Sequence, residues 1–177
     1  VVTGLAWTQF GGDILPIEVN HFKGSGKFIV TGQLGDVMKE SASIALDYLK
    51  AHADKYNLKD IDFDKQDIHI HVPEGAVKKD GPSAGVTLTT AIYSAFTQKP
   101  VRDDVAMTGE VTLTGSVLPI GGLKEKSISA HRSGIHTIII PKDNAKDIDD
   151  IPESVRKDLT IITADHIDTV LENALVK

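Results

Sequence analysis

The stretch DIHIHVPEGAVKKDGPSAGVTLTTAIYSAFT, residues 67–97, combines a strand, a polar loop and a helix. Residues 67–72 alternate, with three polar side chains on one face and three apolar side chains on the other, which is typical of a half-buried strand. Residues 73–82 are predicted as a polar loop, and the small and apolar residues 83–97 predict a helix. A strand that leads through a loop into a helix indicates a mixed α/β domain.

The rest of the chain continues this mixture of strands and helices. A long helix is expected from Gly35-Asp36 to about Asn57, with Asp36 as its N-cap, and another helix follows Gly121-Gly122. Further strands are predicted at residues 3–10, 14–21, 27–31, 105–113, 117–120, 136–140 and 160–163, the first two joined as a hairpin by turn residues 11–13. We predict one α/β (mixed α+β) domain over residues 1–177, with several small mixed sheets packed against about five or six helices.

Composition excludes several classes of function. The 177 residues include no cysteine, which excludes a disulfide scaffold, a thiol nucleophile and a thiolate zinc site. The net charge of −6 and the lack of a basic stripe argue against nucleic acid as a partner. No apolar run approaches the roughly 18 residues of a membrane span, so no membrane partner is expected. The chain opens Val1-Val2-Thr3 without an initiator Met, which predicts a piece of a longer chain.

Three short motifs suggest ligand sites that their surroundings do not support. Gly24-Ser25-Gly26-Lys27 resembles part of a phosphate loop, but Phe and a strand follow where the motif requires Ser or Thr and a helix. The alternating aspartates of residues 60–64 lack the Gly and Glu of a calcium loop. His69 and His71 share a strand face, but no third metal ligand of matching spacing is evident. We therefore predict no metal site in this chain.

Residues 81–85, GPSAG, match the G-x-S-x-G pattern of the nucleophile elbow in α/β-hydrolases. The elbow requires a strand that runs directly into the serine, whereas a loop precedes Ser83 here. An esterase of that class would also need a later histidine, for which His131, His136 and His166 are candidates. Ser83 could instead stand at the N-terminus of the following helix, either as a cap or as a nucleophile whose oxyanion the helix terminus stabilises.

A serine nucleophile requires a base, and a lysine can serve when its amine is neutral. Lys124 and Lys126 lie in the first turn of the helix after Gly121-Gly122, where the helix dipole disfavours a cation. Lys126 can share the inward face of this helix with Ala130, whereas Lys124 is expected to be solvated. The alternative is a non-catalytic peptide-binding module in which Ser83 only caps a helix.

Three blocks of the sequence resemble, in order, motifs of the A-type Lon proteases. They are residues 71–85, HVPEGAVKKDGPSAG; residues 107–113, MTGEVTL; and residues 118–126, LPIGGLKEK. The resemblance covers essentially the whole chain and concerns the proteolytic domain of that family. Lys78 stands where family members often have proline, a difference that removes no catalytic group.

The resemblance implies an ATP-dependent serine endopeptidase with a Ser-Lys dyad, in which Ser83 is the nucleophile and Lys126 the general base. Thr108 matches a threonine whose hydroxyl can orient the lysine amine and help to hold it neutral. Oxyanion stabilisation is expected from backbone N–H groups before the helix, namely those of Gly81, Ser83 and Ala84.

Supporting positions near the cleft match Glu18, His71 and Asp80. A carboxylate beside Lys126 would raise the pKa of the lysine and oppose its function as a base. We therefore expect latent and active arrangements of the loop, with Asp80 in contact with Lys126 in the latent form.

The resemblance also implies substrates, partners and location. Substrates would be unfolded or damaged proteins that lie extended along an exposed strand edge. The full-length protein would be a homohexamer of the bacterial cytoplasm. ATP and magnesium would bind a motor module that is absent from this sequence, so no cofactor is expected here.

Overall fold

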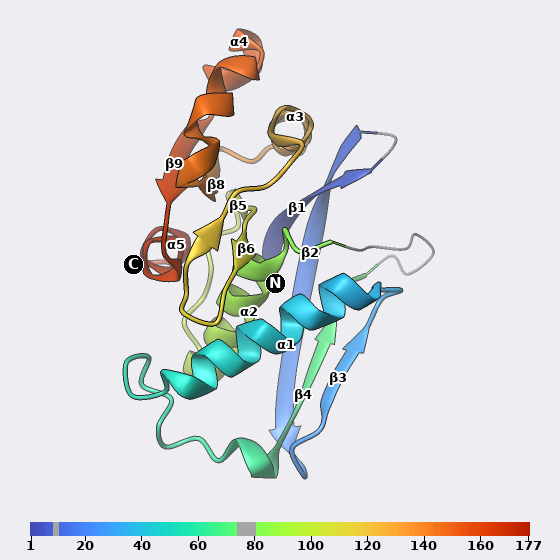
Figure 1. Ribbon diagram of the computed structural model, residues 1–177, viewed down its shortest axis with the longest axis vertical. Helices are drawn as coiled ribbons and strands as arrows, with labels where there is room; N and C mark the ends of the chain where they lie inside the picture. The colour runs from blue at the N-terminus through green and yellow to red at the C-terminus, as the bar shows by residue number, and fades with distance from the viewer. Residues whose placement is uncertain (9–10, 74–80) are drawn as a thin grey trace.

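Figure 1 shows the computed structural model, which describes residues 1–8, 11–73 and 81–177. Seven strands form one sheet in the order β3-β4-β2-β1-β5-β8-β9, and β6 pairs with β7 in a separate sheet. The strands are β1 Val2–Thr8, β2 Gly11–Lys23, β3 Phe28–Thr31, β4 Gln66–His71, β5 Val105–Met107, β6 Glu110–Val111, β7 Val117–Leu118, β8 Thr137–Pro141 and β9 Thr160–Ala164.

The long strand β2 joins the two halves of the large sheet. Its first part pairs antiparallel with β1, and its second part pairs antiparallel with β4, where Glu18 lies opposite His71. Strand β1 pairs parallel with β5, and the sheet continues parallel through β8 to β9. All five residues of β8 are buried, as expected for a parallel strand that is covered on both faces.

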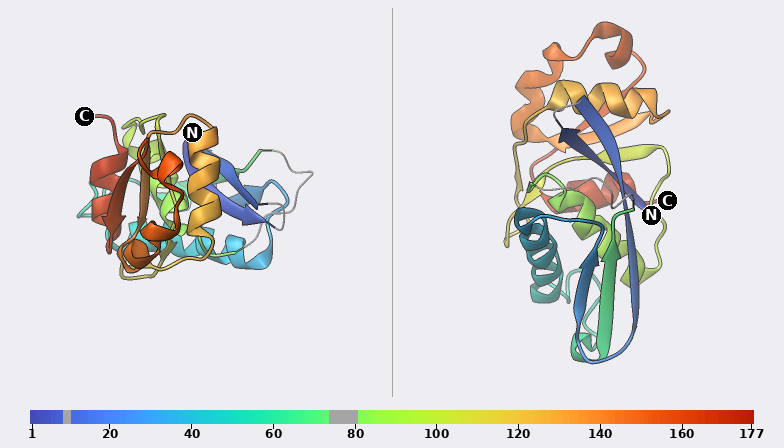
Figure 2. Two further views of the ribbon diagram at one scale, coloured as in Figure 1. Left: turned by 90° about the horizontal axis from the view of Figure 1, so that it is seen from above. Right: turned by 90° about the vertical axis from the view of Figure 1, so that its right-hand side faces the viewer.

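Helices cover this sheet and enclose two hydrophobic cores. Helices α1 and α2 lie side by side and, with α5, enclose the larger core, whereas α3 and α4 cover the smaller core beside β8 (Figures 1 and 2). The helices of the described residues are α1 Asp36–Ala51, α2 Gly85–Thr97, α3 Leu123–Arg132, α4 Glu153–Arg156 and α5 Ile167–Ala174, with 3-10 helices η1 Phe63–Lys65 and η2 Lys142–Asp150.

The predicted mixed α/β class and the approximate number of helices are confirmed. Several local predictions were wrong. Helix α1 ends at Ala51 rather than near Asn57, and Gly35 is its N-cap, so that Asp36 is the first helical residue. The predicted turn residues 11–13 belong to β2. Gly12 is needed there for close packing, because a Cβ would lie 2.2 Å from the backbone oxygen of Glu125.

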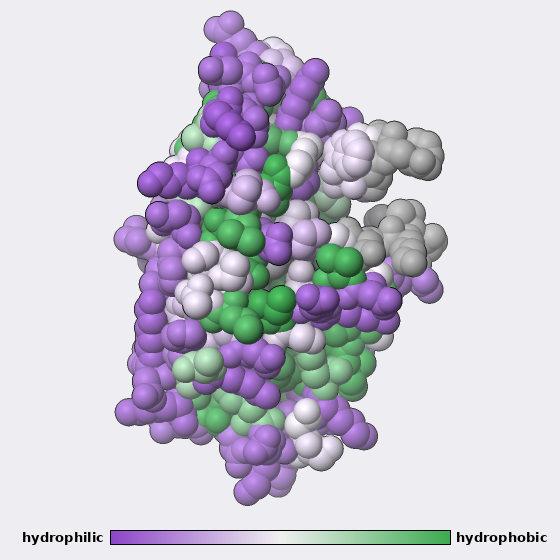
Figure 3. Space-filling view, viewed as in Figure 1, coloured by the Kyte–Doolittle hydropathy of each residue, from purple (hydrophilic) through white to green (hydrophobic). Residues whose placement is uncertain are grey.

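The face seen in Figure 3 carries apolar surface near its centre, over the β6–β7 sheet and α1. The large apolar side chains exposed on these elements are Val37 in α1, Leu113 in the turn after β6, and Leu118 in β7. In the part of the chain that the structure describes, no helix has the length and apolar character needed to cross a membrane.

Candidate active site

A cleft of about 900 Å³ opens where the β1–β2 hairpin, the segment before α2 and the start of α3 meet. Ser83 and Lys126 both line it, although they come from distant parts of the sequence. The other described residues that line the cleft are 5–7, 13–16, 38, 73, 81, 82, 84, 119–122, 125 and 133. The fold therefore brings the two candidate catalytic side chains to one cavity.

Ser83 lies just before helix α2 and is half-buried. The N-cap of this helix is Ala84, and no side chain caps the helix. Ser83 therefore does not occupy the capping position. Its carbonyl oxygen accepts a hydrogen bond of 2.8 Å from the N–H of Gly109. The N–H groups of Ser83 and Ala84 have no acceptor among the described residues.

Lys126 lies in the first turn of α3 and is 2% exposed. Its Nζ donates a hydrogen bond of 3.1 Å to Oγ1 of Thr108. Burial lowers the pKa of Lys126 from its ordinary value of 10.5 to about 8, because the charged form loses its hydration. The neighbouring Lys124 is exposed, as the sequence predicted. A lysine amine with a pKa near 8 is partly neutral near neutral pH and can accept a proton.

The dipeptide Thr108-Gly109 connects the two halves of the site. Sequence reasoning placed it inside a single strand, but the chain leaves the large sheet here, between β5 and β6. The N–H of Thr108 donates to the Ile139 oxygen at 3.1 Å and thereby stays attached to β8. The Thr108 hydroxyl accepts a hydrogen bond from Lys126 Nζ, and the Gly109 N–H donates a hydrogen bond to the Ser83 carbonyl oxygen. Two consecutive residues thus fix the positions of the candidate base and the candidate nucleophile.

The β1–β2 hairpin forms another wall of the cleft. Trp7 of β1 is 59% exposed and lines the cavity. It packs against Gly122, where a Cβ would lie 2.9 Å from the indole Cγ and where φ is +72°. Glycine is required at this position for both space and backbone conformation. Sequence reasoning did not select Trp7, because its place in the cleft wall is visible only in the folded chain.

Comparison with known proteins agrees with this architecture. The family model of the Lon protease (S16) C-terminal proteolytic domain matches residues 1–177. The chain belongs to this Lon proteolytic domain family. It is 61% identical over 176 residues to a Lon protease of Brevibacillus choshinensis and to Lon protease 1 of Bacillus subtilis (strain 168), in each case covering 99% of this chain and 23% of the relative. Lon protease 1 of Myxococcus xanthus is 55% identical over 176 residues, which cover 99% of this chain and 22% of that relative. The chain thus spans about a quarter of the length of these Lon proteases.

Two supporting residues inferred from the Lon resemblance lie beside each other but do not line the cleft. Glu18 is exposed on β2 and faces His71 across the strand pair with β4. Oγ1 of Thr31 lies 2.7 Å from Nδ1 of His71 and 2.9 Å from Nε2 of His69. Both histidines thus contact the Thr31 hydroxyl, and among the described residues no three His, Asp or Glu side chains are grouped so that they could share a metal ion. The third supporting residue, Asp80, lies outside the described residues.

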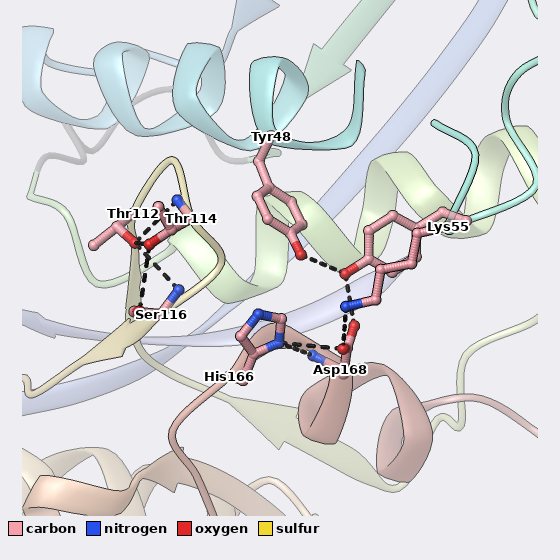
Figure 4. Close-up of polar contacts among 8 residues, drawn as sticks. Tyr48, Lys55, Thr112, Thr114, Ser116, His166 and Asp168 are labelled. Atoms are coloured by element: carbon pink, nitrogen blue, oxygen red, sulfur yellow. Dashed lines mark hydrogen bonds and ion pairs between the residues drawn. The ribbon is translucent and has the colours of Figure 1, made fainter. Parts of the chain in front are cut away.

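A second polar cluster of this Lon domain connects α1 to α5 (Figure 4). The carboxylate of Asp168 accepts hydrogen bonds from Tyr56 Oη, at 2.6 Å, and from Lys55 Nζ. Tyr56 also contacts the buried Tyr48 of α1, and His166 accepts the Asp168 N–H as the N-cap of α5. Burial opposes ionisation of Asp168, but the hydrogen bonds from Lys55 and Tyr56 lower its pKa overall. None of these residues lines the cleft, so the cluster is part of the scaffold.

Proposed function

We propose that this chain is a serine endopeptidase domain in which Ser83 is the nucleophile and Lys126 the general base. The observation that carries this proposal is the buried amine of Lys126, in the same cleft as Ser83, with a pKa lowered to about 8 by burial. A base whose pKa lies near the working pH accelerates proton transfer by about 10²–10⁴-fold. Thr108 accepts one amine hydrogen and orients Lys126 in the cleft.

The proposed reaction passes through an acyl-enzyme. Neutral Lys126 takes the proton of the Ser83 hydroxyl as Oγ attacks the scissile carbonyl carbon. The resulting ammonium gives this proton to the leaving amine when the C–N bond breaks. Lys126 then takes a proton from water as the water oxygen attacks the acyl carbonyl. The ammonium returns this proton to Ser83 Oγ when the C–O bond of the acyl-enzyme breaks, which releases the second product and restores the neutral amine.

The oxyanion of each tetrahedral intermediate would lie at the backbone before α2. The N–H groups of Ser83 and Ala84 stand there without a described acceptor, and Gly81, with φ of +107°, turns the chain into this segment. A well-placed donor of this kind stabilises the transition state by about 2.7–4 kcal/mol. The N-terminus of α2 adds a favourable dipole.

The two other functions suggested by the sequence find less support in this geometry. No histidine lines the cleft among the described residues; instead, His131 pairs with Asp158 and His166 caps α5. An esterase that uses one of them would lose activity when that histidine is replaced. A peptide-binding module would bind a peptide and leave it intact.

The test is hydrolysis of an unstructured fluorogenic peptide by this chain between pH 6 and 10. The rate of acylation should rise about tenfold per pH unit and level off near pH 8, because only the neutral amine accepts a proton. Lys126→Ala should lower kcat by about 10²–10⁴-fold, whereas Lys124→Ala, its exposed neighbour, should not. Normal hydrolysis by Lys126→Ala would refute the dyad.

The wider biology is proposed by analogy with the Lon proteases that this chain matches. We propose that the full-length protein degrades unfolded or damaged proteins as a homohexamer in the bacterial cytoplasm. ATP would bind its motor module. This part of the proposal is tested by measuring the mass of the full-length protein and the ATP dependence of its casein hydrolysis.

A further inference from the structure

Asn144 is a buried amide in an otherwise polar and exposed part of the chain. It is 2% exposed and is the single buried residue of η2, the 3-10 helix that follows β8. Burial of an amide is costly unless its hydrogen-bonding groups are satisfied. The partners of Asn144 therefore indicate what this side chain does.

The Asn144 amide pairs with both backbone groups of a single residue, Ile120. Oδ1 accepts the Ile120 N–H at 2.8 Å, and Nδ2 donates to the Ile120 carbonyl oxygen at 2.9 Å. Nδ2 also donates to Oδ2 of Asp147 at 2.9 Å. Because a carboxylate only accepts, Asp147 fixes which end of the amide faces the Ile120 N–H. The Asn144 side chain thus makes the two hydrogen bonds that the backbone of a neighbouring strand would make to Ile120.

This pairing has a consequence for the residues on either side of Ile120. In a trans peptide group the C=O and the N–H point in opposite directions, and no peptide bond among the described residues is cis. Since the N–H and C=O of Ile120 face Asn144, the carbonyl of Pro119 and the N–H of Gly121 face the other edge. Pro119, Ile120 and Gly121 all line the cleft that contains Ser83. The Gly121 N–H has no acceptor among the described residues, and Gly121 has open space around its Cα.

We propose that Asn144 is a positioning residue for the substrate main chain. It holds residues 119–121 so that the Pro119 carbonyl and the Gly121 N–H form hydrogen bonds with an extended peptide that lies across Ser83. This inference rests on the proposed peptidase function and names the edge that its substrate pairs with. Recognition through main-chain groups is largely independent of sequence, which suits an unfolded polypeptide.

The catalytic pair is held by contacts that do not involve Asn144. Lys126 is buried and bonded to Thr108, and Ser83 is bonded to Gly109. Removing the Asn144 amide should therefore weaken peptide binding and leave the reactivity of Ser83 intact. A purely structural role would instead reduce both.

The experiment compares two reactions of each variant of this chain. Hydrolysis of a fluorogenic peptide of eight or so residues requires main-chain pairing, whereas inactivation by a small phosphonofluoridate requires only Ser83 and its base. Asn144→Ala should lower kcat/KM for the peptide by roughly 10- to 100-fold, chiefly through KM, and leave the inactivation rate unchanged. Asp147→Ala, which frees one end of the amide, should have a smaller effect in the same direction. Asp143→Ala, an exposed acid of the same helix, is the matched control and should behave as wild type.

Each alternative outcome decides the question. An unchanged peptide KM in Asn144→Ala, or an equal loss of peptide hydrolysis and reagent reactivity, would overturn the inference. If Asn144→Ala fails to fold, Asn144→Asp and Asp147→Ala replace it. Asn144→Asp keeps an acceptor for Ile120 but loses the donor, and it should raise KM. A wild-type chain that reacts with neither compound would refute the proposed function, and that result is distinct from failure of this inference.

Discussion

Replacing Lys126 by methionine should make the protein more stable and inactive. The two side chains have similar length, but methionine carries no charge into the core. One pKa unit corresponds to about 1.4 kcal/mol, so lowering the Lys126 pKa from 10.5 to about 8 means that the buried ammonium destabilises the fold by roughly 3 kcal/mol. Lys126→Met also loses the hydrogen bond to Thr108, which offsets about 1 kcal/mol of the stabilisation. We expect a net increase in the free energy of unfolding of roughly 2 kcal/mol at pH 7.

The size of this stability difference must change with pH in a defined way. Below pH 8 the lysine is protonated in both the folded and the unfolded chain, and the folded state bears the full penalty. Between about pH 8 and 10.5 the unfolded chain binds more protons, so wild-type stability rises with pH. The advantage of Lys126→Met should therefore largely disappear by about pH 10.

Urea unfolding followed by circular dichroism at pH 7 and at pH 10 measures both quantities. Lys124→Met, two residues earlier on the exposed side of α3, is the control and should change stability little at either pH. The reasoning is refuted if Lys126→Met is no more stable than wild type at pH 7. It is also refuted if its advantage is the same at both pH values.

Three further variants test other contacts. Thr108→Val removes the acceptor of the Lys126 amine and should lower kcat for a fluorogenic peptide by roughly tenfold with little change in KM; an unchanged kcat would contradict this. Gly12→Ala places a Cβ 2.2 Å from the Glu125 backbone oxygen and should cost about 1–3 kcal/mol in urea unfolding, whereas Gly121→Ala, which meets open space, should not. Asp168→Asn weakens the hydrogen bonds from Lys55 and Tyr56, which follow α1, to the first turn of α5 and should cost about 1 kcal/mol at pH 7. Because the pKa of Asp168 is lowered in the folded state, this difference should shrink as pH falls through that pKa; a difference that grows in acid would refute the assignment.

Local patterns in the sequence were sufficient to place most elements of the fold. The alternation of residues 67–72 correctly predicted that Ile68 and Ile70 of β4 and the following Val72 are buried, although Asp67, on the polar face, is buried as well. Side-chain periodicity determines this result because it depends only on neighbouring residues. The ends of α1 and β2 were less predictable, since contacts with distant segments decide where they stop.

The candidate site divides in the same way. Local features made Ser83 and Lys126 candidates, because one precedes a helix and the other lies in a first helical turn. Their assignment as nucleophile and base came from the resemblance of the surrounding blocks to the Lon motifs. The distance between them in the sequence says nothing about their distance in space. The structure places both in one cleft and shows that Thr108-Gly109 contacts both.

The sequence by itself therefore determined the mixed α/β class, the order of the main elements, the exclusion of thiol chemistry and the two residues proposed for catalysis. Only the tertiary structure decided the burial that lowers the Lys126 pKa, the position of Trp7 in the cleft wall and the pairing of Asn144 with Ile120. The physical reason is that burial and long-range hydrogen bonds depend on which segments meet in space. Those meetings result from packing of the whole chain, whereas helices, strands and turns carry their signals in a few consecutive residues.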